Sequence, residues 1–79
     1  MLLKFEEIEC IGMNVKYTSF AVHDVDVKRI LEGGICQPSG EEYTIIIVKS
    51  YEEESYTTSY KIRGDFDKIL NSFNGYEIY

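Results

Sequence analysis

Two cysteines and one histidine are the residues of this chain best suited to nucleophilic or metal chemistry. Cys10, Cys36 and His23 supply two thiols and one imidazole, the groups of a cysteine–histidine nucleophile. No nucleophile motif surrounds either cysteine, and the spacing of the two matches no zinc motif. The sequence therefore predicts no catalytic residue, no metal site and no cofactor. We expect the chain not to be an enzyme.

The state of the two thiols depends on the compartment. In a reducing compartment we expect Cys10 and Cys36 to be free and partly buried. A disulfide between them stays an open alternative, because a sequence does not give the distance between two side chains.

Carboxylates are the most abundant chemical group, and they occur in clusters. Because these clusters fall where solvent is expected, their carboxyl groups keep ordinary pKa values and make poor acids and bases at neutral pH. The net charge of −6 disfavours binding to phosphate backbones and suits a basic surface on a partner protein. The alternative is that the acidic balance only keeps a small protein soluble. The clustered residues are Glu6, Glu7, Glu9, Glu41, Glu42, Glu52, Glu53 and Glu54.

Tyrosine is frequent, with 7 in 79 residues. Tyrosine is enriched at protein interfaces because it offers a large contact area, few torsions and a polar tip. Packing within the sheet is the alternative role for any single tyrosine. We expect Tyr51, Tyr56 and Tyr60 to be the best surface candidates, with Tyr43, Tyr76 and Tyr79 as further ones.

Two hairpins must position these side chains. Residues 3–11 and 15–22 are rich in β-branched and aromatic residues and flank a turn at 12–14, where glycine and asparagine tolerate positive φ. Residues 43–51 are apolar on both faces and predict an interior strand, paired with a strand at 55–62. The three glutamates at 52–54 then form the tip of the second hairpin.

A short helix is expected after each hairpin. Asp26, or alternatively Asp24, is placed to cap the first helix, whose apolar residues recur at helical spacing before a Gly33-Gly34 stop. Asp65 is placed to cap the second helix, which ends at Asn74-Gly75. The two apolar stripes predict core packing; they are Val27, Ile30 and Leu31 in the first helix, and Phe66, Ile69, Leu70 and Phe73 in the second.

The two halves also resemble each other at one constant offset, as in a duplication. Tyr17 aligns with Tyr56 and Asp26 with Asp65. We therefore expect a single domain over 1–79, with pseudo-repeats at 3–34 and 42–75 and a loop at 35–41. The predicted fold class is α+β: an antiparallel four- to five-stranded sheet from a duplicated ββα unit, with two short helices packed on one face. Residues 76–79 would add a short last strand.

The N-terminal residues do not have the form of a signal peptide, and no apolar run approaches the length needed to cross a bilayer. We expect a cytoplasmic protein, which would mean the host cytoplasm if a phage encodes it.

In its small size, its net charge of −6 and its three glutamate clusters, the chain resembles phage-encoded inhibitors of bacterial defence, including anti-CRISPR proteins. The resemblance implies occupation of a basic nucleic-acid groove on a nuclease, in some cases by mimicry of nucleic acid. It involves no motif, so it transfers no residue. Small immunity proteins and antitoxins share the same traits.

We thus expect a non-catalytic inhibitor or adaptor that binds a basic protein surface through its glutamate clusters and tyrosines, without contacting nucleic acid or membrane directly. The alternative is a homo-oligomer, such as a homodimer, that associates through the edges or the uncovered face of its sheet.

Overall fold

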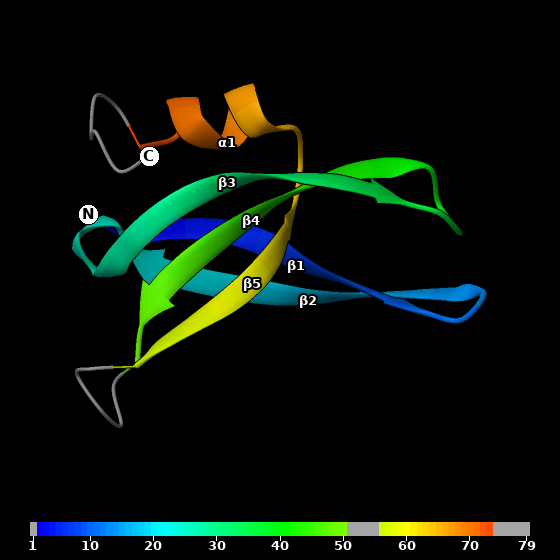
Figure 1. Cartoon of the computed structure of the whole chain (residues 1–79), viewed down its shortest axis with the longest axis horizontal. Helices are drawn as coiled ribbons and strands as arrows, with labels where there is room; N and C mark the ends of the chain where they lie inside the picture. The colour runs from blue at the N-terminus through cyan, green and yellow to red at the C-terminus, as the bar shows by residue number, and fades with distance from the viewer. Residues whose placement is uncertain (1, 51–55, 74–79) are drawn as a thin grey trace.

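The computed structural model describes residues 2–50 and 56–73. These residues form five strands, one 3-10 turn and one short α-helix (Figure 1). In chain order the elements are β1 (Leu2–Ile11), β2 (Asn14–His23), η1 (Asp24–Asp26), β3 (Val27–Cys36), β4 (Glu41–Lys49), β5 (Thr57–Arg63) and α1 (Phe66–Asn71).

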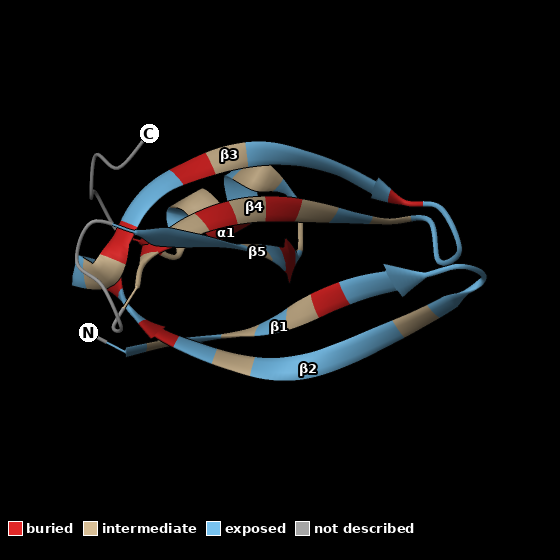
Figure 2. Cartoon of the chain, turned by 60° about the horizontal axis from the view of Figure 1, so that its bottom comes forward, coloured by how far each residue is buried: buried red, intermediate tan, exposed pale blue. Residues whose placement is uncertain are grey.

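All strand pairs are antiparallel, in the order β2-β1-β5-β4-β3. The β1–β2 hairpin is paired without interruption from Leu2 opposite His23 to Ile11 opposite Asn14. By contrast, β1 meets β5 at a single pair, Glu7 opposite Ile62. The hairpin therefore diverges from β3, β4 and β5, and Figure 2 shows the two groups of strands as separate layers.

The main core lies between these layers and under α1. Alternate residues of β4 are fully buried, and Ile30 of β3 and Ile62 of β5 pack with them. Helix α1 adds Ile69, and Phe73 follows just after it. Phe5 of β1 brings its ring centroid to 5.9 Å from that of Phe73. The hairpin, the three-stranded layer and the helix therefore share one apolar cluster.

Helix α1 begins where the sequence predicts it. Asp65 is the N-cap, and its carboxylate accepts a hydrogen bond of 2.8 Å from the backbone N–H of Lys68. This bond satisfies one of the first-turn amides that have no partner within a helix. Ile69 is buried, as the apolar stripe predicts, whereas Phe66 and Leu70 are half-buried against the core.

The prediction of a first helix is wrong, because residues 27–36 form the edge strand β3. Two register shifts interrupt its pairing with β4, one between Val27 and Arg29 and one between Glu32 and Gly34. A bulge adds a residue and so breaks the two-residue alternation of a strand. Val27 and Ile30, three positions apart, are consequently both buried, a spacing that imitates a helical stripe.

The predicted Gly33-Gly34 helix stop has a different role. A Cβ added at Gly33 would lie 2.2 Å from the backbone oxygen of Tyr43 on β4. Glycine is needed here because the neighbouring strand approaches too closely for any side chain. The predicted loop at 35–41 is also shorter than expected, since Ile35 and Cys36 belong to β3 and Glu41 begins β4.

The predicted fold class is therefore wrong: the described residues form a nearly all-sheet protein, in which α1 is the one α-helix, and not a duplicated ββα unit. The aligned segments at 27–31 and 66–70 adopt different structures, a strand and a helix. The predicted strand at 76–79 and the hairpin tip at 52–54 lie outside the described residues.

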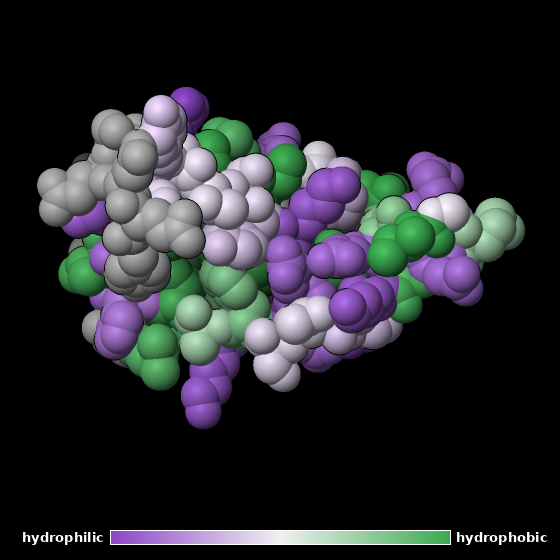
Figure 3. Space-filling view, turned by 90° about the horizontal axis from the view of Figure 1, so that it is seen from below, coloured by the Kyte–Doolittle hydropathy of each residue, from purple (hydrophilic) through white to green (hydrophobic). Residues whose placement is uncertain are grey.

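The turns of the β1–β2 and β3–β4 hairpins lie at the same end of the molecule (Figure 1). Gly12, with φ of +58°, forms the first turn, and Gly40, with φ of +72°, closes the second. Large apolar side chains are exposed at this end, including Met13 at 89% and Ile11 at 57%. Viewed from below, hydrophilic side chains dominate the middle of the surface and hydrophobic ones recur at this narrow end (Figure 3).

Candidate functional site

A disulfide joins the two layers near the hairpin turns. Cys10 near the end of β1 is bonded to Cys36 at the end of β3, with their Cα atoms 6.2 Å apart. These strands are not neighbours in the sheet, so the bond ties together segments that no hydrogen-bond ladder connects. The expectation of free thiols is wrong, and the alternative left open by the sequence is correct. In this state neither sulfur is available as a nucleophile for His23.

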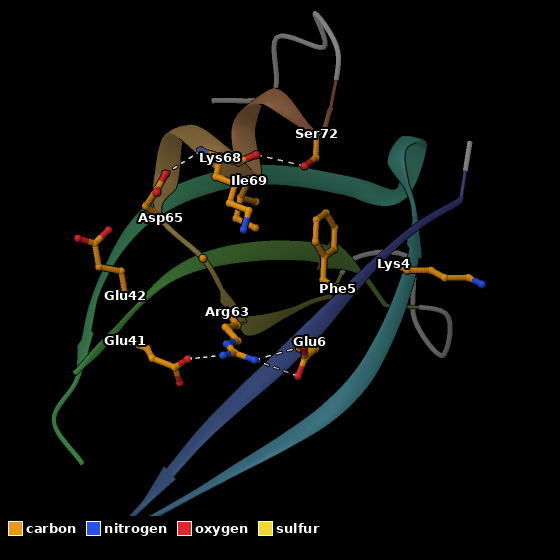
Figure 4. A pocket seen from close by; sticks show the side chains of 11 residues that line it. Lys4, Phe5, Glu6, Glu41, Glu42, Arg63, Asp65, Lys68, Ile69 and Ser72 are labelled. Atoms are coloured by element: carbon orange, nitrogen blue, oxygen red, sulfur yellow. Dashed lines mark hydrogen bonds and ion pairs between the residues drawn. The ribbon is translucent and has the colours of Figure 1, made fainter. Parts of the chain in front are cut away.

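Beside the disulfide, Arg63 at the end of β5 connects three strands. Its Nη2 lies 2.6 Å from Oε1 of Glu41 on β4, and its Nη1 lies 3.3 Å from Oε1 of Glu6 on β1. Figure 4 shows the guanidinium group between the two carboxylates. Tyr17 of β2 completes the group: its hydroxyl donates a hydrogen bond to Glu41, and its ring centroid lies 4.8 Å from Cζ of Arg63. We call Glu6, Tyr17, Glu41 and Arg63 the charge network.

The hydrogen bonds of the charge network shift its protonation equilibria. The hydroxyl of Tyr17, followed by the guanidinium of Arg63, stabilises the ionised Glu41 and lowers the pKa of its carboxyl group. The same hydrogen bond raises the pKa of Tyr17, because ionisation would remove the donated proton. The pKa of Arg63 is raised, mainly through its hydrogen bond to Glu41. These interactions stabilise the ion pair of Glu41 with Arg63 and keep the hydroxyl of Tyr17 protonated. They therefore suit structural pairing rather than proton transfer.

A cleft of about 810 Å³ opens next to the charge network, between β1, the β4–β5 pair and α1 (Figure 4). Its lining combines both signs of charge: the basic residues are Lys4, Arg63 and Lys68, and the acidic residues are Glu6, Glu41, Glu42 and Asp65. Glu6 and Glu41 are already paired with Arg63, and Asp65 is engaged as the helix cap. Much of the charge in this cleft is therefore satisfied within the protein.

A second depression, of about 580 Å³, has a lining of one sign only. Of the residues that the structure describes, four carboxylates line it, and neither lysine nor arginine does. The aromatic rings of Tyr43 and Phe66 and the backbone of Gly33 and Gly34 form the rest of its surface, together with Ile35. We call this depression the acidic groove; its carboxylates are Glu32, Glu42, Asp65 and Asp67.

The acidic groove and the charged cleft adjoin, because both are lined by Glu42 and Asp65. Asp65 caps α1, but Glu32, Glu42 and Asp67 are exposed and form no ion pair within the described part of the chain. Three solvated carboxylates beside two aromatic rings are suited to receiving cationic side chains.

The structure brings together only some of the predicted site residues. Glu6 and Glu41 meet in the charge network, Glu42 lies in the acidic groove, and Glu7 and Glu9 lie along β1. Tyr56 is 63% exposed, as expected of a surface candidate.

The other tyrosine and glutamate predictions have mixed outcomes. Tyr60 is half-buried, with its ring centroid 4.5 Å from that of Phe20, which is the packing role left open for any single tyrosine. Tyr43 is half-buried, and Nζ of Lys61 lies 5.2 Å from its ring centroid. The remaining predicted residues lie outside the described ranges: Tyr51, Glu52, Glu53, Glu54, Tyr76 and Tyr79.

Sequence reasoning missed Tyr17, Arg63, Glu32 and Asp67. Single charged residues carry no local signal of their pairing, so the roles of Arg63 and Glu32 depend entirely on which strands meet. Asp67, two residues after the Asp65 cap, does have a signal: a carboxylate in the first turn of a predicted helix. That signal indicates helix stabilisation and does not point to a groove.

Two further findings concern possible metal ligands and the length of the helices. Within residues 2–50 and 56–73, no group of three His, Cys, Asp or Glu side chains is placed to hold a metal ion. Helical segments in the same ranges are too short and too polar to cross a bilayer. The arrangement offers charge pairing and contact surface.

Comparison with known proteins adds no relative: no family model, no curated protein and no solved structure matches this chain.

Proposed function

We propose that this chain is a non-catalytic binding protein, an inhibitor or adaptor, that presents its acidic groove to a basic surface on a partner protein. The observation that carries the proposal is the composition of that groove. Glu32, Glu42 and Asp67 are exposed there, beside Tyr43 and Phe66, and no lysine or arginine of the described residues lines the groove. The net charge of −6 also attracts a basic surface, and it acts over a longer range than the groove.

Each part of the acidic groove has a physical role in this proposal. The carboxylates attract lysine and arginine side chains and accelerate association, most strongly at low salt. The rings of Tyr43 and Phe66 add contact area. Gly33 and Gly34 leave room for the Tyr43 ring, which packs against their backbone and so lies beside the carboxylates of the groove.

A basic surface that binds nucleic acid is the partner that best suits this chemistry, since phosphate and carboxylate are recognised by the same cationic side chains. The proposal therefore includes inhibition of a nuclease by occupation of its nucleic-acid site, as in a phage anti-defence protein. An immunity protein or antitoxin that neutralises a basic toxin would use the same groove in the same way.

Cytoplasmic residence, expected from the sequence, belongs to this proposal and conflicts with the disulfide, because cytosolic reductants keep most protein thiols reduced. Alkylation of the protein in acid-quenched cells, followed by mass spectrometry, resolves the conflict. A dithiol places the protein in a reducing cytoplasm, and a protected disulfide places it in an oxidising compartment.

Neutralising the acidic groove tests the proposed function. The partner is first isolated by affinity capture and then titrated with wild type and with the Glu42→Gln/Asp67→Asn variant. We expect affinity to fall roughly tenfold and the salt dependence to flatten, as for the loss of close charge pairs. The control, Glu9→Gln, removes a carboxylate of β1 that lies outside the groove. An equal loss of affinity per charge removed in both variants would show that net charge, and not the groove, determines binding.

A further inference from the structure

The two edge strands of the sheet differ in their protection against pairing with another chain. On one edge, β3 is interrupted by two register shifts and carries Gly33 and Gly34, features that disrupt pairing with an added strand. On the other edge, β2 runs for 10 residues with no shift in its pairing to β1 and contains no proline. Of the two edges, β2 is the one left open.

Among the described residues, no element covers the outer side of β2, which is the last strand in the sheet order and lies at the edge of its layer in Figure 2. One side of its backbone pairs with β1, and no other described residue forms a backbone hydrogen bond to the other side. Most of its side chains are exposed, and none of them is a carboxylate. A strand with free N–H and C=O groups on one side is a template for the addition of an extended segment.

The charges behind β2 indicate what kind of segment fits. Glu6 and Glu7 of β1 lie opposite Ser19 and Thr18, which are among the smaller residues of β2. Neighbouring strands are about 5 Å apart, so a lysine or arginine on an added strand can extend over these short side chains toward the glutamates. Glu7 forms no ion pair within the described residues. Oε1 of Glu6 lies 3.3 Å from Nη1 of the exposed Arg63, which also pairs with Glu41.

We propose that β2 binds an extended segment of a partner protein, which adds to the sheet as a further strand and carries lysine or arginine at alternate positions. Alternate side chains of a strand share a face, so such a segment would direct its cations toward either Glu6 or Glu7. This surface is distinct from the acidic groove, whose carboxylates come from β3, β4, α1 and its cap. It does not depend on the function proposed for that groove.

A second copy of this chain is a poorer occupant of the same edge. Its own β2 would bring only Lys16 and His23 toward the glutamates, and Lys16 already lies opposite Glu9 on β1. Two copies would also bring together two net charges of −6. Charge complementarity therefore favours a basic segment over self-pairing.

The test uses a synthetic peptide of the length of β2 with alternating lysine and threonine. Its matched control carries N-methyl groups on the backbone of two adjacent central residues. These groups block hydrogen bonding on both edges of the peptide without changing its charge. We expect the unmodified peptide to slow amide hydrogen exchange along β2, and the methylated peptide to bind roughly tenfold more weakly because the strand pairing is lost. Equal affinity of the two peptides, or protection of residues away from β2, would overturn the proposal.

Two variants separate this surface from the acidic groove. Glu7→Gln should weaken binding of the lysine–threonine peptide about threefold, a typical effect of one exposed charge pair. Glu42→Gln/Asp67→Asn weakens the acidic groove as a second site for the basic peptide, and saturating peptide should still protect the β2 amides of this variant. Loss of that protection in the groove variant, with protection retained in Glu7→Gln, would overturn the β2 proposal and support the proposed function. Sedimentation showing a dimer with β2 amides protected in the absence of peptide would assign the edge to self-association instead.

Discussion

The β1–β2 hairpin is attached to the rest of the molecule in two different ways at its two ends. Near the chain terminus, Phe5 packs against Phe73, and the contact is part of the apolar cluster under α1. Near the hairpin turn, the attachment is the Cys10–Cys36 disulfide. Between the two ends lie the ion pair of Glu6 with Arg63 and the single strand pair that links β1 to β5.

This contrast shows how a small chain compensates for a limited core. A domain of 79 residues buries only a modest share of its apolar surface, so one cluster does not hold every element. Ile8 and Cys36 are buried near the hairpin turns but lie outside the main cluster. There, a covalent link and specific polar contacts hold the hairpin to the rest of the molecule, whereas apolar packing holds it near α1.

The largest effect is expected from breaking the apolar end. Phe73→Ala should reduce the free energy of unfolding by about 3–5 kcal/mol, because it removes a fully buried ring and leaves a cavity next to Phe5 and Ile69. Chemical denaturation monitored by circular dichroism measures this loss. Val25→Ala is the control: Val25 is 66% exposed, so its truncation should change little. If Phe73→Ala reduced the free energy of unfolding as little as Val25→Ala, Phe73 would not be part of the main core.

Breaking the covalent end should have the next largest effect. The Cys10→Ser/Cys36→Ser variant should lose about 3.5 kcal/mol, the value expected for a crosslink between residues with a sequence separation of 26. Reduction of the wild type should give a similar loss. In hydrogen exchange, amides near the hairpin turns should become less protected than those of Ile46 in the core. Uniform loss of protection would mean that the two ends do not act separately.

Removal of the helix cap tests the apolar end more gently. Asp65→Ala should cost about 1 kcal/mol, because the N–H of Lys68 loses its side-chain acceptor while the packing of Ile69 is retained. Asp65→Asn and Asp65→Ser, which keep a capping oxygen, should recover most of the stability. If all three variants lose stability equally, the role of Asp65 is in the charged cleft rather than in the cap.

The smallest effect is expected from titrating the charge network. The pKa of Glu41 is lowered in the folded state by the Tyr17 hydrogen bond and by Arg63, so its stabilisation is present above the usual glutamate pKa and is lost as pH falls through the lowered value. The pKa of Tyr17 is raised, so its contribution is present below the usual tyrosine pKa and is lost as pH rises through the raised value.

A comparison of wild type with Tyr17→Phe across pH measures this effect. The variant lacks the hydroxyl at every pH, so the difference in unfolding free energy should be largest near neutrality and shrink in acid and in alkali. Denaturation at a series of pH values provides the measurement. A difference that stays constant with pH would mean that the hydroxyl contributes no linked protonation.

Local patterns predicted the elements that are governed by local physics. Strands β1, β2, β4 and β5 lie close to the predicted ranges, and α1 begins after Asp65 as its capping signal indicates. Strand β3 was mispredicted because its bulges place Val27 and Ile30 on one face at a helical spacing. These two register shifts between β3 and β4 are therefore the reason why the predicted fold class was wrong.

The candidate site was less predictable, because it is built from contacts between distant segments. Arg63 meets Glu6 and Glu41 only because β1 and β4 flank β5. The disulfide depends on a Cα distance that no spacing in the sequence contains. Glu42 was correctly placed among surface carboxylates, but its companions Glu32 and Asp67 come from β3 and α1.

The single pair between β1 and β5 also has a consequence for folding. Glu7 and Ile62 are far apart in the sequence, so β1 meets its partner across the layers only after a long loop has closed. A β1–β2 hairpin that has not yet docked exposes Leu3, Phe5 and Phe20, which pack against the core in the folded protein. Because contacts of such long range slow folding, we expect the docking of this hairpin to be a late step.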